Sequence, residues 1–154
     1  MSSDDHELPS VNLKRQLPEA YRALAALTRS AGRFDDGLDE LIKVRASIAN
    51  RCSYCIDTHT TRAVAEGEDP RRLHALAAWA DSAFFTPRER AALAVTDAIT
   101  MIGDGHDLTD ALQKAAAEFS EDELNRLVAA IVASNAWNRA AIASRFAASP
   151  LASV

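Results

Sequence analysis

A chain of 154 residues with 48% hydrophobic and 25% charged side chains has the size and composition of one ordinary globular domain. Its formal net charge of -5 argues against a nucleic-acid partner, because phosphate binding requires concentrated positive charge. Two cysteines are too few for a secreted disulfide scaffold, and no apolar stretch is long enough to span a bilayer. The opening residues, MSSDDHELPS, lack the features of a signal peptide, so we expect a cytoplasmic protein with no membrane partner.

Helical periodicity recurs along the chain and its alanine-rich composition favours helix, whereas strand signals are nearly absent. Residues 1–15 are polar and contain Pro9, which predicts a flexible arm. A first helix is expected over 18–31, with a proline in its first turn and a glycine directly after it. A second helix is expected over 36–50, and a third over 52–67, where a glycine ends it.

Four further helix starts follow. An Asp-Pro dipeptide at 69–70 opens a fourth helix, and the capping box TPRE at 86–89 opens a fifth. The glycines of GDGHD end that helix, and a sixth begins near Thr109. A second capping box, SEDE at 120–123, opens a long last helix that is expected to run to about residue 148. We find no boundary between domains, so the sequence predicts a single all-α domain over the full chain, a helical bundle of about seven helices.

Both cysteines lie in the segment RCSYCIDTH. Positions three and four apart share one face of a helix, so Cys52, Cys55 and His59 are expected to stack along one stripe. Cys52 falls in the first turn, where unpaired N–H groups and the helix dipole favour a thiolate. The two sulfurs are also close enough in sequence for a disulfide within the helix.

Glu40 lies one helix earlier, and hairpin geometry brings it level with His59. If the turn lies near Asn50, the rise of an α-helix places Glu40 ~15 Å back along its helix and His59 ~12 Å along the next. A carboxylate beside an imidazole holds the tautomer of the ring and strengthens it as a base toward Cys55. Glu40, His59 and a thiol are therefore predicted to form a proton relay.

The segment ELIKVRASIANRCSYCIDTHTTRA, residues 40–63, resembles the core of the AhpD-like alkylhydroperoxidases in the carboxymuconolactone decarboxylase superfamily. Redox members of that family carry a Glu, eleven residues, and then Cys-x-x-Cys-x-x-x-His. This chain matches the pattern with Glu40, Cys52, Cys55 and His59. The tail NAWNRAAIASRF is also similar to the last helix of the family.

The resemblance implies an alkylhydroperoxidase that reduces a small organic hydroperoxide or hydrogen peroxide without a metal or organic cofactor. In the family the second cysteine attacks the peroxide and the first resolves the sulfenic acid, and these roles fall on Cys55 and Cys52. His59 and Glu40 would manage the protons. The resemblance further implies an antioxidant role, an external dithiol reductant that restores the pair, and a homo-oligomer such as a dimer, trimer or hexamer.

One position departs from the family pattern. Family members often place a second histidine between the cysteines, where this chain has Tyr54. A phenol donates a hydrogen bond but is a poor base at neutral pH, since its reference pKa is about 10. The decarboxylase branch of the family acts on a lactone without this cysteine pair, so the cysteines favour dithiol chemistry over that reaction.

Other interpretations of the same residues stay open. Cys52 and Cys55 are suited to a structural zinc site with His59 and Glu40, or to plain core packing. A dithiol that switches assembly without turnover would make the protein a redox sensor. Aromatic residues such as Trp137 are expected mainly in the core or in subunit contacts, although some of them could roof the thiol pocket.

Overall fold

The computed structural model describes residues 11–34 and 37–148, and within these residues it contains eight α-helices, one 3-10 helix and no strand. The elements in chain order are α1 (Leu13–Gln16), α2 (Pro18–Ser30), α3 (Leu38–Ala49), α4 (Ser53–Ala65), α5 (Pro70–Ala75), η1 (Leu76–Asp81), α6 (Pro87–Thr100), α7 (Leu108–Ala115) and α8 (Glu121–Ala143). The all-α fold class expected from the sequence is confirmed. No helix in the described ranges is both long and apolar enough to cross a lipid bilayer.

Reciprocal capping boxes fix the starts of α6 and α8, as the sequence predicts. At α6 the Thr86 hydroxyl accepts a hydrogen bond from the backbone N–H of Glu89, whose carboxylate accepts one from the backbone N–H of Thr86 at 2.8 Å. Ser120 and Glu123 make the same exchange at the start of α8. These bonds satisfy N–H groups that a helix start otherwise leaves unpaired, so both starts are set by local sequence.

The arm and the fourth helix expected from the sequence differ from the structure. The arm expected over residues 1–15 includes the short helix α1, which Asn12 caps by accepting a hydrogen bond from the backbone N–H of Arg15; residues 1–10 lie outside the described part. The single helix expected from residue 69 is two elements, α5 and η1. Ala78 leaves helical geometry inside η1, at φ -131° and ψ 40°, and so kinks the chain between two short helical turns.

The last helix ends at Ala143, five residues earlier than expected. Arg145 adopts a left-handed φ of 54°, and the backbone N–H of Phe146 donates to the carbonyl of Ala141 at 3.0 Å. This pattern is a Schellman end, in which a left-handed residue lets the chain satisfy the last carbonyls of the helix. The chain therefore turns back at the end of α8 and carries Phe146 with it.

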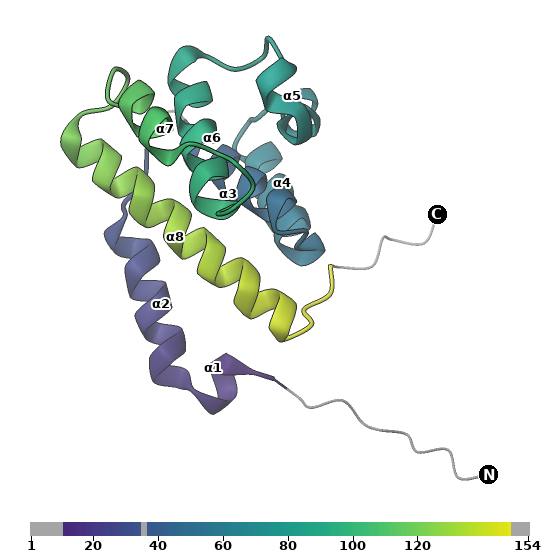
Figure 1. Cartoon of the computed structure of the whole chain (residues 1–154). Coiled ribbons are helices and arrows are strands. Elements are labelled where there is room, and N and C mark those ends of the chain that lie inside the picture. The colour runs from purple at the N-terminus through teal and green to yellow at the C-terminus, as the bar shows by residue number, and fades with distance from the viewer. Residues whose placement is uncertain (1–10, 35–36, 149–154) are drawn as a thin grey trace, which may run out of the picture.

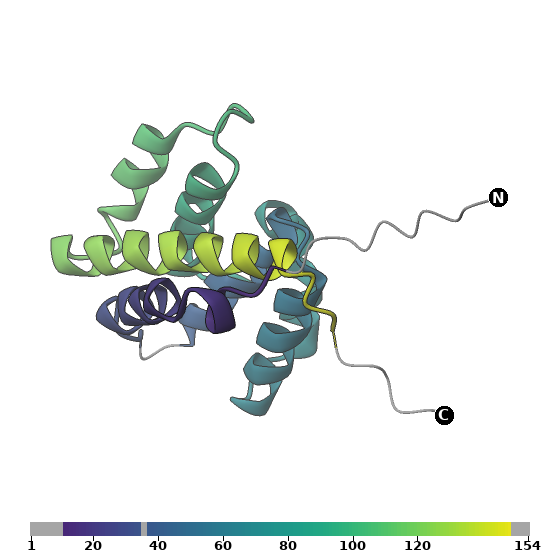
Figure 2. The same cartoon turned by 90° about the horizontal axis from the view of Figure 1, so that it is seen from below.

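Helix α3 lies at the centre of the molecule, with α4, α6 and α8 packed around it. Helix α2 lies along one side of α8, and α6 and α7 lie on the other side (Figures 1 and 2). The main core cluster joins α3, α6, α7 and α8. Its buried members are Phe34, Leu38, Ile42, Ala91, Ala92, Val95, Ala98, Ala111, Ala115, Phe119, Leu127 and Ile131.

A largely buried ion pair holds α3 to α6. Nε and Nη2 of Arg45 donate to the two carboxylate oxygens of Asp97 at 2.6 and 3.0 Å, and the indole N–H of Trp79 donates to the same carboxylate at 2.9 Å. The two charges are desolvated together, so each depends on the other for its hydrogen bonds. This network fixes the register of α3, the helix that also carries Glu40.

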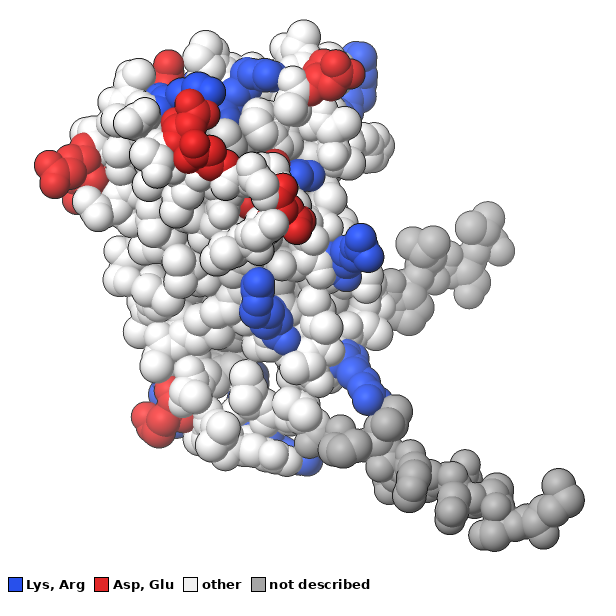
Figure 3. All heavy atoms as spheres, in the orientation of Figure 1, with Lys and Arg blue, Asp and Glu red and all other residues white. Residues whose placement is uncertain are grey.

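The molecular surface mixes charges of both signs. On the face shown in Figure 3, lysine and arginine side chains stand as separate spots, several of them beside acidic side chains, and do not form one continuous basic area. This distribution agrees with the acidic balance of the whole chain.

Candidate active site

The two cysteines lie where α3 turns directly into α4. Arg51 adopts a left-handed φ of 57°, and the backbone N–H of Cys52 donates to the carbonyl of Ser47 at 3.0 Å, which closes the end of α3. Cys52 is also the N-cap of α4, because its sulfur accepts a hydrogen bond from the backbone N–H of Cys55 at 3.3 Å. One residue therefore ends one helix and begins the next, at the helix start where the sequence predicted it.

Cys52 and Cys55 form a disulfide, with their Cα atoms 5.3 Å apart. Both side chains are buried, at 2% and 5% exposure, and they pack against Ala141 of α8. Cys55 lines the large cavity described below, whereas Cys52 is absent from its lining. The pair therefore presents one sulfur to the cavity and holds the other within the helix junction.

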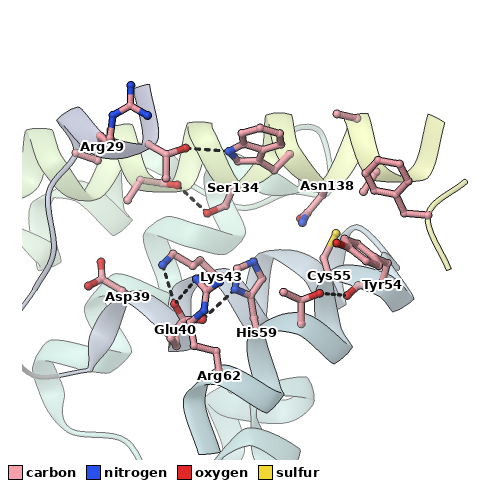
Figure 4. A pocket seen from close by; sticks show the side chains of 18 of the residues that line it. Arg29, Asp39, Glu40, Lys43, Tyr54, Cys55, His59, Arg62, Ser134 and Asn138 are labelled. Carbon is pink, nitrogen blue, oxygen red and sulfur yellow. Dashed lines mark hydrogen bonds and ion pairs between the residues drawn. The ribbon is translucent and has the colours of Figure 1, made fainter. Parts of the chain in front are cut away.

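Glu40 and His59 meet across the α3–α4 hairpin. His59 Nδ1 lies 2.9 Å from Glu40 Oε2, and the other carboxylate oxygen accepts from Lys43 Nζ at 2.8 Å (Figure 4). Arg62 Nη1 approaches that same oxygen at 3.7 Å. The sequence-based expectation that these two helices bring Glu40 level with His59 thus agrees with the observed geometry.

The negative charge of Glu40 determines which nitrogen of the His59 ring carries the hydrogen. Burial of Glu40 acts to raise its pKa, but the hydrogen bonds from His59 and Lys43 and the charge of Lys43 outweigh burial and lower that pKa to about 2. The group is therefore a carboxylate at neutral pH, which accepts hydrogen bonds and donates none. His59 must carry its hydrogen on Nδ1, so Nε2 is the ring nitrogen left for chemistry.

A cavity of about 590 Å³ opens beside these residues, bounded by α2, α3, α4 and α8. One wall is aromatic: Tyr21 packs edge-on against Trp137 with ring centroids 5.0 Å apart, and Tyr54 packs against Phe146 at 5.3 Å. The lining also has a polar part, where Lys43, His59 and Arg62 converge on Glu40 (Figure 4). The cavity can therefore accept a molecule with an apolar body and place it against Cys55.

Several residues of this cavity escaped the sequence analysis. Lys43 and Arg62 follow Glu40 and His59 by three positions each, so helical spacing alone was enough to find them. Asn138 comes from α8, about 80 residues further along the chain, and no local pattern links it to the cysteines. The aromatic roof that the sequence suggested is formed in part by Trp137, whose indole N–H also donates to Thr28 of α2 at 2.8 Å.

Within the described residues, no group of three or more His, Cys, Asp or Glu side chains is arranged to hold a metal ion. His59 and Glu40 bond to each other, and the two sulfurs bond to each other, so the four residues form two pairs in this structure. The zinc interpretation requires the same four side chains to converge on one point.

An all-α fold that holds a Cys-x-x-Cys pair at a helix start, beside a buried Glu–His pair, is of the AhpD-like type. The chain belongs to the carboxymuconolactone decarboxylase family, whose model matches residues 15–98, a span that contains all four motif residues.

Known proteins with related chains agree with this placement. An uncharacterized protein of Bacillus subtilis (strain 168), YdfG, is 38% identical over 104 residues, which cover 68% of this chain and 71% of that protein. A protein of unknown function from Agrobacterium tumefaciens, proposed to be the antioxidant defence protein AhpD, is 33% identical with a TM-score of 0.83, covering 93% of this chain and 99% of its own. An uncharacterized peroxidase-related protein from Ralstonia eutropha JMP134, with an alkylhydroperoxidase AhpD core, shares the fold at 21% identity and a TM-score of 0.73, over 86% and 72% of the two chains.

Proposed function

We propose that the protein is a thiol-dependent peroxidase of the alkylhydroperoxidase type, which reduces a small organic hydroperoxide or hydrogen peroxide through its Cys52–Cys55 pair. One observation carries this proposal: a cysteine of the disulfide lines a cavity that also contains a hydrogen-bonded Glu–His pair. This combination supplies a nucleophile, a base, an orienting acid and a second thiol for resolution. The family membership and its peroxidase-related relatives support the same reaction class.

Cys55 is the attacking residue in this proposal. His59 Nε2 takes the proton of the Cys55 thiol, and the thiolate attacks the terminal peroxide oxygen. The S–O bond forms as the O–O bond breaks, which leaves a sulfenic acid on Cys55 and an alkoxide. The alkoxide takes the proton back from His59 and departs as an alcohol. The sulfur has been oxidised by two electrons and the peroxide reduced by two.

Cys52 completes the oxidative half of the cycle. Its sulfur attacks the sulfenic sulfur of Cys55, the S–S bond forms, and water leaves with the hydroxyl of the sulfenic acid and the proton of Cys52. An external dithiol then reduces the disulfide by thiol exchange and is itself oxidised to a disulfide. The short backbone separation of the two residues suits this closure without movement of either helix.

Glu40 acts as a positioning residue for His59. Its carboxylate holds the Nδ1 hydrogen, so the ring keeps one tautomer and Nε2 stays available as base and then as acid. Lys43 Nζ lies 2.8 Å and Arg62 Nη1 3.7 Å from the other oxygen of Glu40, so the carboxylate that orients His59 is itself held in place.

The aromatic wall suits an organic substrate. The Tyr54–Phe146 and Tyr21–Trp137 ring pairs offer an apolar surface to the carbon group of a hydroperoxide, and Tyr54 occupies the position where family members often have a histidine. We therefore propose an organic hydroperoxide as a better substrate than hydrogen peroxide, which cannot use this surface.

The protein is further proposed to act as a homo-oligomer in the cytoplasm. Large apolar side chains are exposed in several parts of the described chain, among them Leu17, Val132 and Ile142 of α8 and, at 85% exposure, Ile102. Burial of such side chains between subunits is favourable, since apolar area removed from water stabilises association. Light scattering coupled to size exclusion measures the subunit count, and a strictly monomeric protein contradicts this part of the proposal.

Turnover experiments test the enzyme assignment. Steady consumption of cumene hydroperoxide with a dithiol reductant is expected for the wild type.

Cys55→Ser should abolish peroxide-driven oxidation, while Cys52→Ser should still form a sulfenic acid that dimedone traps; the opposite pattern would exchange the two roles. A protein that forms its disulfide once but shows no turnover with any dithiol would instead be a redox sensor. Stoichiometric zinc in protein purified without chelator would exclude the free dithiol.

A further inference from the structure

A cluster of three asparagines ties α8 to the turn that carries the cysteines. The Asn50 amide nitrogen donates to Oδ1 of Asn135 at 3.0 Å and to Oδ1 of Asn138 at 2.9 Å. The Asn138 amide nitrogen donates to Oγ of Ser47 at 3.1 Å. Ser47 links this cluster to the cysteines, because its carbonyl also accepts the backbone N–H of Cys52.

The orientation of the Asn138 amide follows from its partners. The single hydrogen of the Ser47 hydroxyl is donated to the carbonyl of Lys43 at 2.6 Å, so toward Asn138 that oxygen can only accept. The partner atom of Asn138 must therefore be its nitrogen. On the other side, Asn50 offers an N–H group, which only the oxygen of Asn138 can accept. Both contacts require the same orientation.

One amide N–H group of this asparagine cluster has no hydrogen-bond acceptor. The Asn50 amide uses both hydrogens on its two asparagine partners, and the Asn135 amide uses both on Thr100 Oγ1 at 2.9 Å and the Ile131 carbonyl at 3.0 Å. Asn138 uses one hydrogen on Ser47. Its second N–H has no acceptor among the described residues, although the side chain is only 1% exposed. A buried donor without an acceptor is destabilising, so such a group in a cavity indicates a bound partner.

The unused hydrogen belongs to a side chain at the reacting end of the cavity. Asn138 lines the cavity together with Cys55 and His59, and it lies one helical turn before Ala141, which packs on the disulfide. In Figure 4 its amide nitrogen extends from α8 toward the side of the cavity that holds Cys55, His59 and Lys43. A molecule that reaches Cys55 from the cavity therefore passes beside this N–H group.

We propose that Asn138 is a catalytic residue, which donates its second N–H to the peroxide oxygen that departs when Cys55 attacks. This inference rests on the proposed peroxidase function. The O–O bond breaks as the S–O bond forms, and negative charge develops on the departing oxygen. Asn138 stabilises that charge by a hydrogen bond and transfers no proton; the proton comes from His59. A donor held in place before the reaction, in a site with little water, is most effective at this task.

The test compares two oxidants in the Cys52→Ser background, where reaction stops at the sulfenic acid. tert-Butyl hydroperoxide expels a strongly basic alkoxide, whereas peracetic acid expels the much less basic acetate, which needs little stabilisation. Addition of Asn138→Ala is expected to lower the second-order rate constant for tert-butyl hydroperoxide on the order of 10²-fold, the effect typical of one such donor. The rate constant for peracetic acid should fall less than about 10-fold by the same reasoning.

Asn135→Ala is the matched structural control. It breaks the same cluster at Asn50, but Asn135 does not line the cavity, so any loss of rate should be equal for both oxidants. If Asn138→Ala does not fold, Asn138→Leu, which fills a similar volume without a donor, carries the comparison.

Equal losses for the two oxidants, or no loss, in a folded Asn138 variant would overturn the role of Asn138 and leave the peroxidase assignment intact. A Cys52→Ser parent that reacts with neither oxidant would overturn the peroxidase assignment, and the role of Asn138 with it.

Discussion

Nδ1 of His59 and Oε2 of Glu40, 19 positions apart in the chain, lie 2.9 Å from each other across the α3–α4 hairpin. Glu40 is 3% exposed, so the bond is sheltered from water and is strengthened accordingly. Its partners on both oxygens keep Glu40 ionised.

Replacing His59 by alanine should shift the pH at which the reactive thiol forms its thiolate. In the proposed mechanism the imidazole receives the thiol proton, so alkylation of Cys55 by iodoacetamide in the reduced wild type should begin at lower pH than in His59→Ala. The rate of alkylation is measured between pH 5 and pH 10 by mass spectrometry of the peptide that carries both cysteines. Identical pH profiles for the two proteins would remove His59 from the relay. His74→Ala, an exposed histidine on α5, is the matched control.

Glu40→Gln should change how stability depends on pH. The pKa of Glu40 is lowered from 4.5 to about 2 in the folded protein, so the unfolded chain binds the proton more readily. Stabilisation by this group is therefore complete above about pH 5 and is lost as the pH falls toward 2, and its full size is about 3 kcal/mol.

Urea unfolding between pH 3 and pH 7 measures this effect. The difference in unfolding free energy between wild type and Glu40→Gln should shrink as the pH falls through that range. Glu66→Gln serves as control, since Glu66 pairs with Arg33 on the surface and exposed pairs contribute less than about 1 kcal/mol. A constant difference across the pH range would contradict the assigned charge of Glu40.

Phe146→Ala should weaken the use of organic hydroperoxides. Its ring forms the aromatic wall with Tyr54, and its removal is expected to lower kcat/KM for cumene hydroperoxide by about 10-fold, as expected for the loss of one aromatic contact and its apolar area. The value for hydrogen peroxide should stay unchanged, because that substrate has no apolar group. Phe84→Ala is a close control: both phenylalanines are 43% exposed, but Phe84 lies outside the cavity. A parallel fall for both peroxides would refute the role of this wall.

Asp97→Ala should destabilise the fold strongly. It leaves the guanidinium of Arg45 largely buried without its carboxylate, and removal of one partner from such a pair costs about 3–5 kcal/mol. Chemical denaturation measures the loss. Asp110→Ala breaks an exposed pair with Lys114 on α7 and is expected to change stability by less than about 1 kcal/mol. Similar small losses in both variants would show that the Arg45–Asp97 pair does not anchor α3.

The features that could be predicted from the sequence are those that depend on residues close together in the chain. The capping boxes at Thr86 and Ser120 start their helices through neighbours three residues away, so their effect is visible in a short window. The Glu40–His59 contact was also accessible, because two helices joined by a tight turn can be aligned by counting residues.

The parts that sequence reasoning missed depend on distant or unusual backbone features. Asn138 reaches the site only because α8 packs across the α3–α4 hairpin, and nothing in its own surroundings in the sequence indicates this contact. The early end of α8 was hidden because Arg145 adopts the left-handed conformation, which usually signals glycine. Phe146 was among the aromatic residues that could roof the thiol pocket, but the turn that carries it to the cavity wall was not predicted.

The position of Cys52 at the junction of α3 and α4 bears on how the fold responds to reduction of the disulfide. Its backbone N–H belongs to the end of one helix and its sulfur begins the next, and a thiolate sulfur can accept the Cys55 N–H just as the disulfide sulfur does. Loss or gain of the sulfur–sulfur bond is therefore expected to leave the two helix ends in place. Repeated oxidation and recovery should proceed without partial unfolding, so the molecule should not become a target for proteases or aggregation while it works.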